Sequence, residues 1–373
     1  MKKIVMGMLL LFVFVFPAMA SGTTETTSAS AKAEAIAKAD EGLDAQTLAF
    51  LDGKDFTGQT LVVGVWGGVI EDIIRENIIP PLEARGAKVE LLLGGTGDRM
   101  SKIYMEKDNP TMDICYLNLY ECQQAMADGI TEAPSSKIPA YDDLYDLAQI
   151  GGYGQSFMGL GIAYNPDYFD EAPQWADLWK PEYKGKIAFP SYPGSEGDGF
   201  LAIAARLNGA DEHDVDAGFE KLQELCPIPL VYNSLDELFM MMDAGDVVAA
   251  PVINGYAWTY VDKGMNISFS WPENPGSVKM MDVLTIVANN KHPELADAWT
   301  QLAMCPKTQT AYAEQIYFGP TNSKVELDGA LADRTVYREK VDSLVDLDWL
   351  YIISQRADWT NRWNQELVEY KGN

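Results

Sequence analysis

The stretch VVGVWGGVIED, residues 62–72, joins a β-branched apolar run to a glycine turn and then to a helical pattern. A strand, a tight turn and a helix can form a phosphate-binding loop, or they can border a pocket for another ligand. The three glycines lack the G-x-G-x-x-G spacing, and the bulk of Trp66 would crowd a pyrophosphate. We therefore predict a strand end that borders a ligand cleft, in which Gly67 and Gly68 form the turn.

The order of strand, turn and helix repeats twice more along the chain. Strands are predicted at 60–66, 88–94 and 113–118, and helices at 69–82, 98–106 and 121–128. Strands that alternate with helices form a parallel sheet with helices on both faces. Ligands bind at the carboxyl ends of such strands, which is where Gly67, the glycines at 94–97 and Asn118 fall.

A second α/β unit is predicted beyond residue 185. Its strands are expected at 186–191, 247–255 and 283–289, and its helices at 199–209, 216–226, 234–243 and 292–304. Residues 21–57 begin with a run rich in Ser, Thr and Ala, and we interpret them as a flexible leader before the globular part.

The N-terminus has the composition of an export signal. Two lysines precede an apolar run from Ile4 to Phe16, and the small-residue sequence Ala18-Met-Ala20 follows. This order predicts a signal peptide at 1–20, cleaved after Ala20, and a periplasmic protein; an uncleaved anchor is the alternative. No Cys follows the cleavage site directly, so a lipid anchor is not expected.

Composition excludes one large class of function and favours another. The formal net charge of −27 argues against nucleic acid, because phosphate binding needs clustered Lys and Arg. The same charge is typical of a soluble protein, and it also suits a cationic ligand. Hydrophobic residues make up 47% of the chain, which is enough for a substantial core.

Catalytic and metal-binding patterns are missing from the sequence. No nucleophile motif, phosphate loop or zinc spacing is present, and we expect structural roles for His213 and His292, the two histidines. The sequence therefore predicts neither an enzyme nor a cofactor or metal site. An exported chain permits disulfides, but buried free thiols are the favoured state of the four cysteines, Cys115, Cys122, Cys226 and Cys305.

Several segments, taken in order, resemble the extracellular solute-binding proteins that feed ABC importers, and most of all their spermidine/putrescine-binding branch. Single motifs are weak, but their shared order from about Leu61 to Trp363 is specific. The segments are VWGG (65–68), NPTMDICYLNLY (109–120), GLGIAYNPDYF (159–169), WADLWKPEYKGKIAF (175–189), INGYAW (253–258), MMDVLTIVAN (280–289), HPELADAWTQLAM (292–304) and FGPTN (318–322).

The resemblance implies an α/β fold of the two-lobed periplasmic-binding-protein type (type II). Each lobe would hold a mainly parallel sheet flanked by helices, and crossing strands would form the hinge. Lobe 1 is expected at 58–163 and 281–328, and lobe 2 at 164–280 and 329–373. The implied partners are a small-molecule ligand in the cleft and an ABC permease in the inner membrane; the protein itself is expected to be a monomer.

A polyamine is an apolar chain that carries ammonium groups, so its site needs carboxylates and aromatic walls. The resemblance places a cleft aromatic at Trp66, polar and aromatic contacts at Asn118 and Tyr120, and an amine-binding carboxylate at Asp282. It also makes candidates of the following residues from the two lobes: Gly67, Thr96, Glu196, Asp198, Asn254, Tyr256 and Phe318.

The chain departs from the polyamine binders at two positions. They usually carry Trp where Met280 and Ile253 stand here. A zwitterionic amino-acid-like ligand is therefore an open alternative, since Asp282 could meet its amine while a glycine-rich helix start holds its anion. A sensor or adhesin on the same fold is a further alternative.

Overall fold

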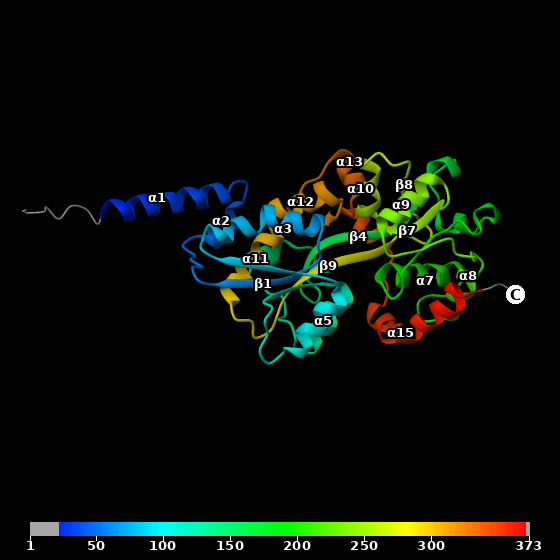
Figure 1. The fold of residues 1–373 in the computed structure, drawn as a ribbon, viewed down its shortest axis with the longest axis horizontal. Helices are drawn as coiled ribbons and strands as arrows, with labels where there is room; N and C mark the ends of the chain where they lie inside the picture. Colours follow the sequence, from blue (N-terminus) through cyan, green and yellow to red (C-terminus); the bar gives the residue numbers. More distant parts are fainter. Residues whose placement is uncertain (1–21, 371–373) are drawn as a thin grey trace, which may run out of the picture.

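The structure, a computed structural model, describes residues 22–370; the predicted signal peptide lies outside them. The described chain forms two groups of elements joined by two long strands (Figure 1). We call the group around β1, β2 and β3 lobe 1, and the group around α7, α8 and β7 lobe 2. No helix within the described range is long and apolar enough to cross a membrane.

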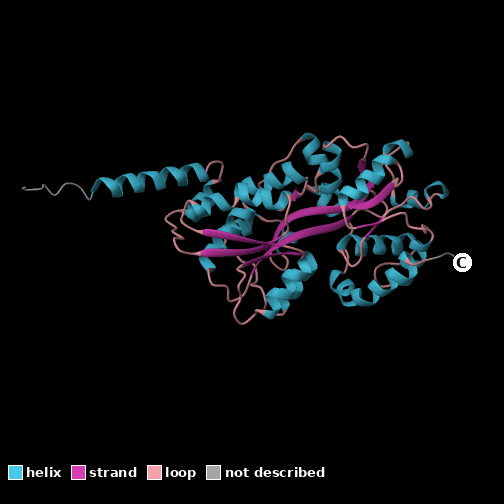
Figure 2. Ribbon diagram, in the orientation of Figure 1, coloured by secondary structure: helices cyan, strands magenta, loops and turns pink. Residues whose placement is uncertain are grey.

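One sheet of eight strands runs through both lobes. β1 pairs in parallel with β2 and β3, as the alternation of strands and helices predicts. β9 is antiparallel to β3 and β4, and the two long strands β4 and β9 cross from one lobe to the other (Figure 2). The strands are β1 (Thr60–Val65), β2 (Lys88–Leu93), β3 (Ile114–Asn118), β4 (Tyr153–Tyr164), β5 (Phe189–Pro190), β6 (Val231–Tyr232), β7 (Ala249–Ile253), β8 (Ser268–Ser270), β9 (Val278–Ile286) and β10 (Gly319–Pro320).

Lobe 2 has fewer parallel strands than expected. β7 and β8 both pair antiparallel with β4, and the parallel pair β5–β6 forms a separate small sheet. The reason lies in β4: all twelve of its residues are buried, so it serves as a central strand in both lobes. Because β4 and β9 belong to both lobes, the residue limits given for the lobes stay a prediction.

Helices cover the sheet in both lobes. Short 3-10 turns join several of them, including Trp175–Trp179. The α-helices are α1 (Gly22–Ala39), α2 (Ala45–Leu51), α3 (Val69–Asn77), α4 (Ile79–Glu83), α5 (Thr96–Met105), α6 (Leu119–Ala127), α7 (Ser195–Leu207), α8 (Val215–Gln223), α9 (Leu235–Ala244), α10 (Asn254–Asp262), α11 (Pro293–Met304), α12 (Pro306–Ile316), α13 (Gly329–Arg334), α14 (Glu339–Ser343) and α15 (Trp349–Arg362).

The interpretation of residues 21–57 as a flexible leader needs correction. α1 projects from lobe 1, but the chain after it is held against the lobe (Figure 1). Arg85 donates to both oxygens of Asp40 at 2.8 and 2.7 Å, and the side chain of Leu51 is fully buried. Gln301 also donates to the hydroxyl of Thr47 at 2.9 Å. The polar composition at 21–38 concealed this docking, which depends on partners far along the chain.

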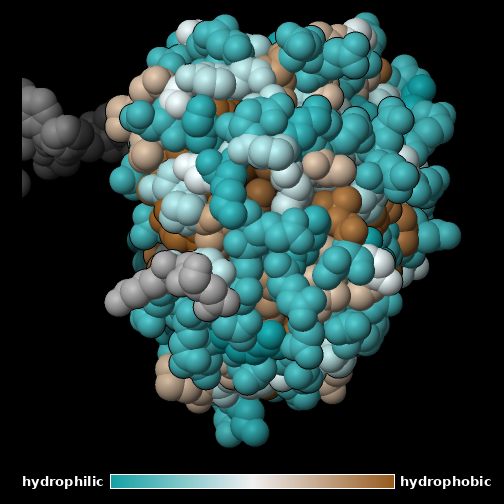
Figure 3. Space-filling view, turned by 90° about the vertical axis from the view of Figure 1, so that its right-hand side faces the viewer, coloured by the Kyte–Doolittle hydropathy of each residue, from teal (hydrophilic) through white to brown (hydrophobic). Residues whose placement is uncertain are grey.

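The surface and the core separate as the composition predicts. The face of lobe 2 seen in Figure 3 is largely hydrophilic, with hydrophobic residues visible only between polar ones. The large core groups include Trp175, Trp299 and Trp363, all fully buried. The four cysteines are free and buried, in agreement with the expectation of unpaired thiols.

Candidate functional site

A pocket of about 410 Å³ lies between the two lobes. This volume is in the range that binds small molecules. Its lining comes from lobe 1, from the crossing strands and from lobe 2, so closure of the lobes would change its shape. The lining includes Trp66, Thr96, Asn118, Tyr120, Glu121, Met158, Glu196, Ile253, Tyr256, Met280, Met281, Asp282, Trp349 and Arg356.

Lobe 1 contributes the carboxyl ends of its parallel strands. Trp66 follows β1, Thr96 is the first residue of α5 after β2, and Asn118 ends β3. The amide of Asn118 donates to the hydroxyls of Tyr120 and Thr96 at 3.3 and 3.4 Å, so it joins two of the strand ends. Trp66, Thr96, Asn118 and Tyr120, all predicted site residues, therefore form one wall of the pocket. They lie together because the carboxyl ends of parallel strands meet at the same edge of the sheet.

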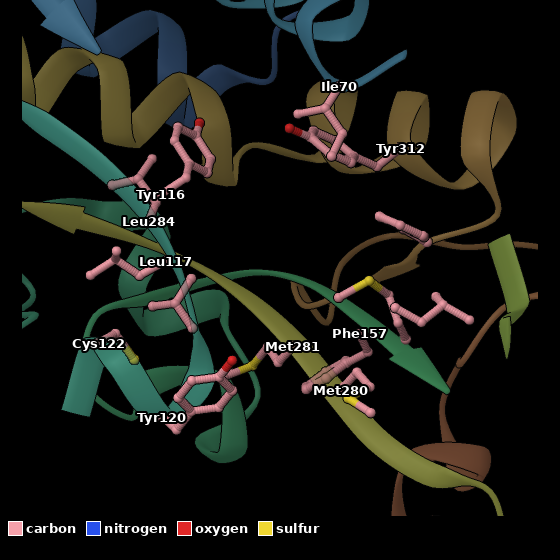
Figure 4. Packing of buried hydrophobic residues seen from close by; sticks show 14 of the residues in the cluster. Ile70, Tyr116, Leu117, Tyr120, Cys122, Phe157, Met280, Met281, Leu284 and Tyr312 are labelled. Carbon is pink, nitrogen blue, oxygen red and sulfur yellow. The ribbon is translucent and has the colours of Figure 1, made fainter. Parts of the chain in front are cut away.

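The crossing strands form the floor of the pocket. Met158 of β4 and Met280 of β9 are direct partners in the sheet, and Asp282 follows two residues later on β9. Residues two apart in a strand share a face, so Asp282 and Met280 point to the same side. Figure 4 shows Met280 and Met281 on β9, with Tyr120 in the first turn of α6, the helix that follows the neighbouring strand β3. The floor thus combines pliable thioethers with one carboxylate.

Helices α7 and α15 of lobe 2 both contribute to the pocket lining. Glu196 belongs to the first turn of α7, and α15 supplies Trp349 and Arg356. The ring of Trp349 stacks on Tyr120 of lobe 1 at 5.5 Å, and the guanidinium of Arg356 lies 4.6 Å from the same ring. Tyr120 is therefore an aromatic contact between the lobes as well as part of the pocket.

Asp282 is a buried carboxylate without a partner. Its residue is 7% exposed, and neither a hydrogen bond nor an ion pair to its carboxylate occurs among residues 22–370. Burial raises the pKa of Asp282 to about 7; the positive charge of Arg99 opposes this rise, while Glu196 and Glu121 add to it by repulsion. A buried carboxylate with a raised pKa has no cation close enough to stabilise its negative charge.

Glu196 and Glu121 complete a group of three acidic side chains. Burial raises the pKa of Glu196, whose carboxylate accepts the neighbouring hydroxyl of Ser195 at 3.1 Å and forms no ion pair within the described chain. Burial also raises the pKa of Glu121 to about 7. Glu121 accepts the backbone N–H of Asn118 at 3.2 Å and so caps α6. Glu121 was not among the predicted site residues, although the Asn-x-x-Glu spacing, a capping signal, could have pointed to it.

Asp198 is not brought to the pocket, although the sequence made it a candidate. It is fully buried, forms an ion pair with Arg356, and accepts the hydroxyl of Tyr192 at 2.6 Å. Its neighbour two positions earlier, Glu196, lines the pocket, because residues two apart on a helix point in different directions. Asp198 therefore holds Arg356 in place and does not face a ligand.

Three other candidates also lie away from the lining. The side chain of Asn254 accepts from the backbone of Gly159 at 3.0 Å and donates to two backbone carbonyls, at 2.8 and 2.9 Å. It starts α10, so the Asn-Gly pair is a helix start and not the expected end of a strand. Phe318 is fully buried against the pocket residue Tyr256 at 5.7 Å, and Gly67 turns the chain beside the pocket.

We expect Asp198→Asn to lower the free energy of unfolding by about 2 kcal/mol. The amide can still accept one hydrogen bond, so the loss is smaller than for complete removal of a buried partner. Chemical denaturation measures the change. The matched control is Asp216→Asn, which also removes a carboxylate from an arginine of α15, Arg362. Asp216 has a side chain that is 77% exposed, so the control should change stability by less than about 1 kcal/mol.

Residues 82–336 of the chain match the family described as bacterial extracellular solute-binding protein. Among curated relatives, the spermidine/putrescine-binding periplasmic protein of Escherichia coli (strain K12) is 28% identical over 197 residues, 50% of this chain and 55% of that protein. The gamma-aminobutyric acid-binding protein of Pseudomonas aeruginosa is 24% identical over 298 residues, 74% of this chain and 80% of that protein. The chain thus spans about half the length of the first of these relatives.

A solved structure of an ABC transporter from Clostridium perfringens ATCC 13124 has the same fold. It superposes with a TM-score of 0.70 at 28% identity, over 82% of this chain and 99% of that chain. These matches confirm the family resemblance that the ordered motifs indicated, and the two-lobed fold that it implied.

Proposed function

The chain belongs to the family of bacterial extracellular solute-binding proteins, and we propose that its pocket captures a small organic cation of the diamine or polyamine type. One observation carries the proposal: the buried Asp282 and the partly buried Glu196 are carboxylates of one pocket, and neither has a cationic partner at ion-pair distance among the described residues. Ammonium groups of a ligand would supply the missing partners.

The balance of charge supports a ligand with more than one positive charge. Arg356 is the cationic side chain of the lining, and its charge is already answered by Asp198. Glu121, Glu196 and Asp282 remain as acidic groups; the buried Arg99 offsets the charge of Asp282 in part, and Arg356 offsets that of Glu121 in part. A dication would relieve their mutual repulsion, whereas an anion would add to it.

The walls support a ligand with an apolar body. Trp66, Tyr120, Tyr256 and Trp349 offer aromatic surface, and methionines line the floor. Methylene groups between the ammonium groups would lie against these side chains and lose contact with water. Methionine in place of a flat indole makes the floor adaptable, so we expect tolerance of several chain lengths.

Transport of the captured solute is part of the proposal. The family supports the role of a periplasmic receptor that passes its ligand to an ABC permease, and the predicted signal peptide supports export. The crossing strands β4 and β9 offer a hinge, about which the lobes would close on the ligand. The proposal includes no catalytic step, because the family is one of solute receptors.

A zwitterionic ω-amino acid is the second candidate. Two observations favour it: a relative that aligns over 74% of this chain is named for γ-aminobutyrate, and the Nε of Arg356 is buried with no partner in the described chain. In that case the ligand amine would meet Asp282 and its carboxylate would meet Arg356. The acidic excess around Arg356 makes this the weaker candidate.

The decisive experiment is calorimetric titration of the mature protein with putrescine, spermidine, γ-aminobutyrate and succinate. We expect binding of both polyamines and none of succinate. A ligand at 100 times its Kd should also raise the free energy of unfolding by about 2.7 kcal/mol, which thermal shift detects. Tighter binding of γ-aminobutyrate than of putrescine would favour the zwitterion, and a response to succinate alone would overturn the amine proposal.

A further inference from the structure

Arg99, on the first turns of α5, is a buried cation that the pocket lining does not include. Its residue is 3% exposed, and its guanidinium donates to the carbonyl oxygens of Tyr116 (3.0 Å) and Gly94, and to the hydroxyl of Thr96 (3.3 Å). All three acceptors are neutral. A buried charge without a close partner of opposite sign is costly, so other features must explain why arginine stands here.

Two acidic groups of the pocket influence the charge of Arg99. Asp282 and Glu121 both act on its charge through space, although neither forms an ion pair with it. Cys115 lies close as well, but burial raises the pKa of its thiol to about 12, so it is neutral at ordinary pH. The positive charge behind the lobe 1 wall is therefore balanced by the carboxylates in front of it.

Arg99 also supports an aromatic side of the pocket. Its guanidinium lies 4.4 Å from the ring centre of Trp66, in the geometry of a cation–π contact. One face of the indole is thus covered by protein, which leaves the rest of the ring for a ligand. Arg99 ties together the ends of β1, β2 and β3, since it contacts Trp66, Gly94 and Tyr116.

The strand β1 is built to admit this side chain. A Cβ atom at Gly64 would lie 2.8 Å from Cδ of Arg99 and 2.6 Å from Sδ of Met112, both too close. Glycine in a strand costs stability, and close approach of another group is a common reason for it. The glycine two residues before Trp66 therefore makes room for the arginine that holds Trp66.

We propose that Arg99 is the internal counter-ion of this pocket: its buried guanidinium holds the Trp66 ring as a ligand wall and places a fixed positive charge behind the carboxylates that a ligand meets. The inference concerns the pocket of the proposed function and depends on that function in no other way. Arg99 would be a positioning residue, which prepares the negative charge that a ligand ammonium then meets directly.

Other titratable groups also face Asp282, and the test must separate them from Arg99. Negative charges on Glu121 and Glu196 raise the pKa of Asp282, whereas the positive charge of Arg99 lowers it. The neighbouring phenols stay neutral, because burial raises their pKa values; they are Tyr116 of β3, Tyr256 of α10 and Tyr312 of α12. Among the groups just named, Arg99 is the cation, so its removal should raise the pKa of Asp282.

The test is an NMR titration of the Asp282 carboxyl carbon in the empty protein, with Asp282→Asn used to assign its resonance. From about 7 in the unmodified chain, the pKa should rise by about one unit or more in Arg99→Gln, the usual scale of such perturbations. In Arg99→Lys the charge remains while the planar fork is lost, so the pKa should stay within about half a unit. An unchanged pKa in Arg99→Gln overturns the inference, as does an equal rise in both variants.

Putrescine titrations of the same variants give a second measurement. Arg99→Gln should bind about tenfold more weakly than the unmodified protein near pH 7, with the difference vanishing or reversing by about pH 9, where Asp282 is ionised regardless. A uniform loss at both pH values indicates packing alone and overturns the counter-ion role. If the unmodified protein bound no amine at all, the proposed function would fail, while the NMR result would still decide the role of Arg99.

Discussion

Asp282→Asn should weaken the binding of putrescine about 100- to 1000-fold, the cost of removing one partner from a buried charge-assisted pair. The substitution keeps the shape of the side chain and removes only its charge. Asp282 has no hydrogen-bond partner among the described residues, so the amide leaves no other group unpaired. Calorimetric titration at pH 8 measures the loss, and an affinity within about threefold of the unmodified protein would contradict the proposed amine contact.

The same substitution should stabilise the empty protein. Burial disfavours the ionised form of Asp282, so removing that charge should raise the free energy of unfolding by about 1–2 kcal/mol at pH 8. Asp198→Asn provides the contrast, because the carboxylate of Asp198 is paired with Arg356 and its loss should destabilise. A gain of stability with a loss of binding is the signature of a site that keeps unfavourable charge for a ligand.

Binding of putrescine should also weaken about a hundredfold between pH 8 and pH 5.5. Putrescine keeps both of its charges over this range, so the change comes from the protein. Asp282 and Glu121 have pKa values of about 7 in the empty pocket, and an ammonium group must displace their protons at lower pH. The affinity should therefore fall by up to tenfold per pH unit for each proton displaced.

The stability of the empty protein should change in the opposite direction. The folded pKa values of Asp282 and Glu121 lie above the unfolded values of about 4, so the folded state binds more protons between about pH 4 and pH 7. The contribution of these two groups to stability is thus present at low pH and is lost as pH rises through about 7. Thermal unfolding at pH 5.5 and pH 8, compared between the unmodified protein and Asp282→Asn, isolates the part due to Asp282.

An affinity that does not vary with pH would show that the two carboxylates are not protonated in the empty pocket. The comparison needs a ligand that stays charged throughout, as putrescine does, because a weaker base would add its own titration. It also needs ionic strength to be constant, since exposed carboxylates elsewhere on this acidic chain respond to salt.

Local sequence patterns predicted much of lobe 1 and its wall of the pocket. The alternation of apolar strands and helices placed the segments around Gly67, Thr96 and Asn118 at strand ends, and parallel pairing then brings such ends together. The family resemblance added Trp66 and Tyr120 as contacts beside these ends. Asp282 was identified through its place in an ordered family motif, and the structure puts it in the same pocket. Patterns of this kind succeed because each depends on neighbours only a few residues away.

The opposite side of the pocket was not predictable in that way. Arg356 and Trp349 stand on a C-terminal helix whose own pattern indicates only an amphipathic surface. Arg356 bonds to Asp198, which lies 158 positions earlier in the chain. Because of this ion pair, Asp198 supports the pocket and does not line it. Spacing within α7 could not reveal which of its two carboxylates faces inward.

Three features of the protein follow from the order of its amino acids: the succession of strands and helices, the glycine turn after Trp66 and the membership of a solute-binding family. They depend on hydrophobic periodicity, the small size of glycine and motifs that recur in order. The pairing of charges, in contrast, required the folded molecule: Asp198 lies with Arg356, whereas neither Arg99 nor Asp282 has a partner of opposite charge at close range among the described residues. Ion pairing depends on the approach of segments that are far apart in the chain. Burial then determines the energetic cost of each charged side chain that has no partner.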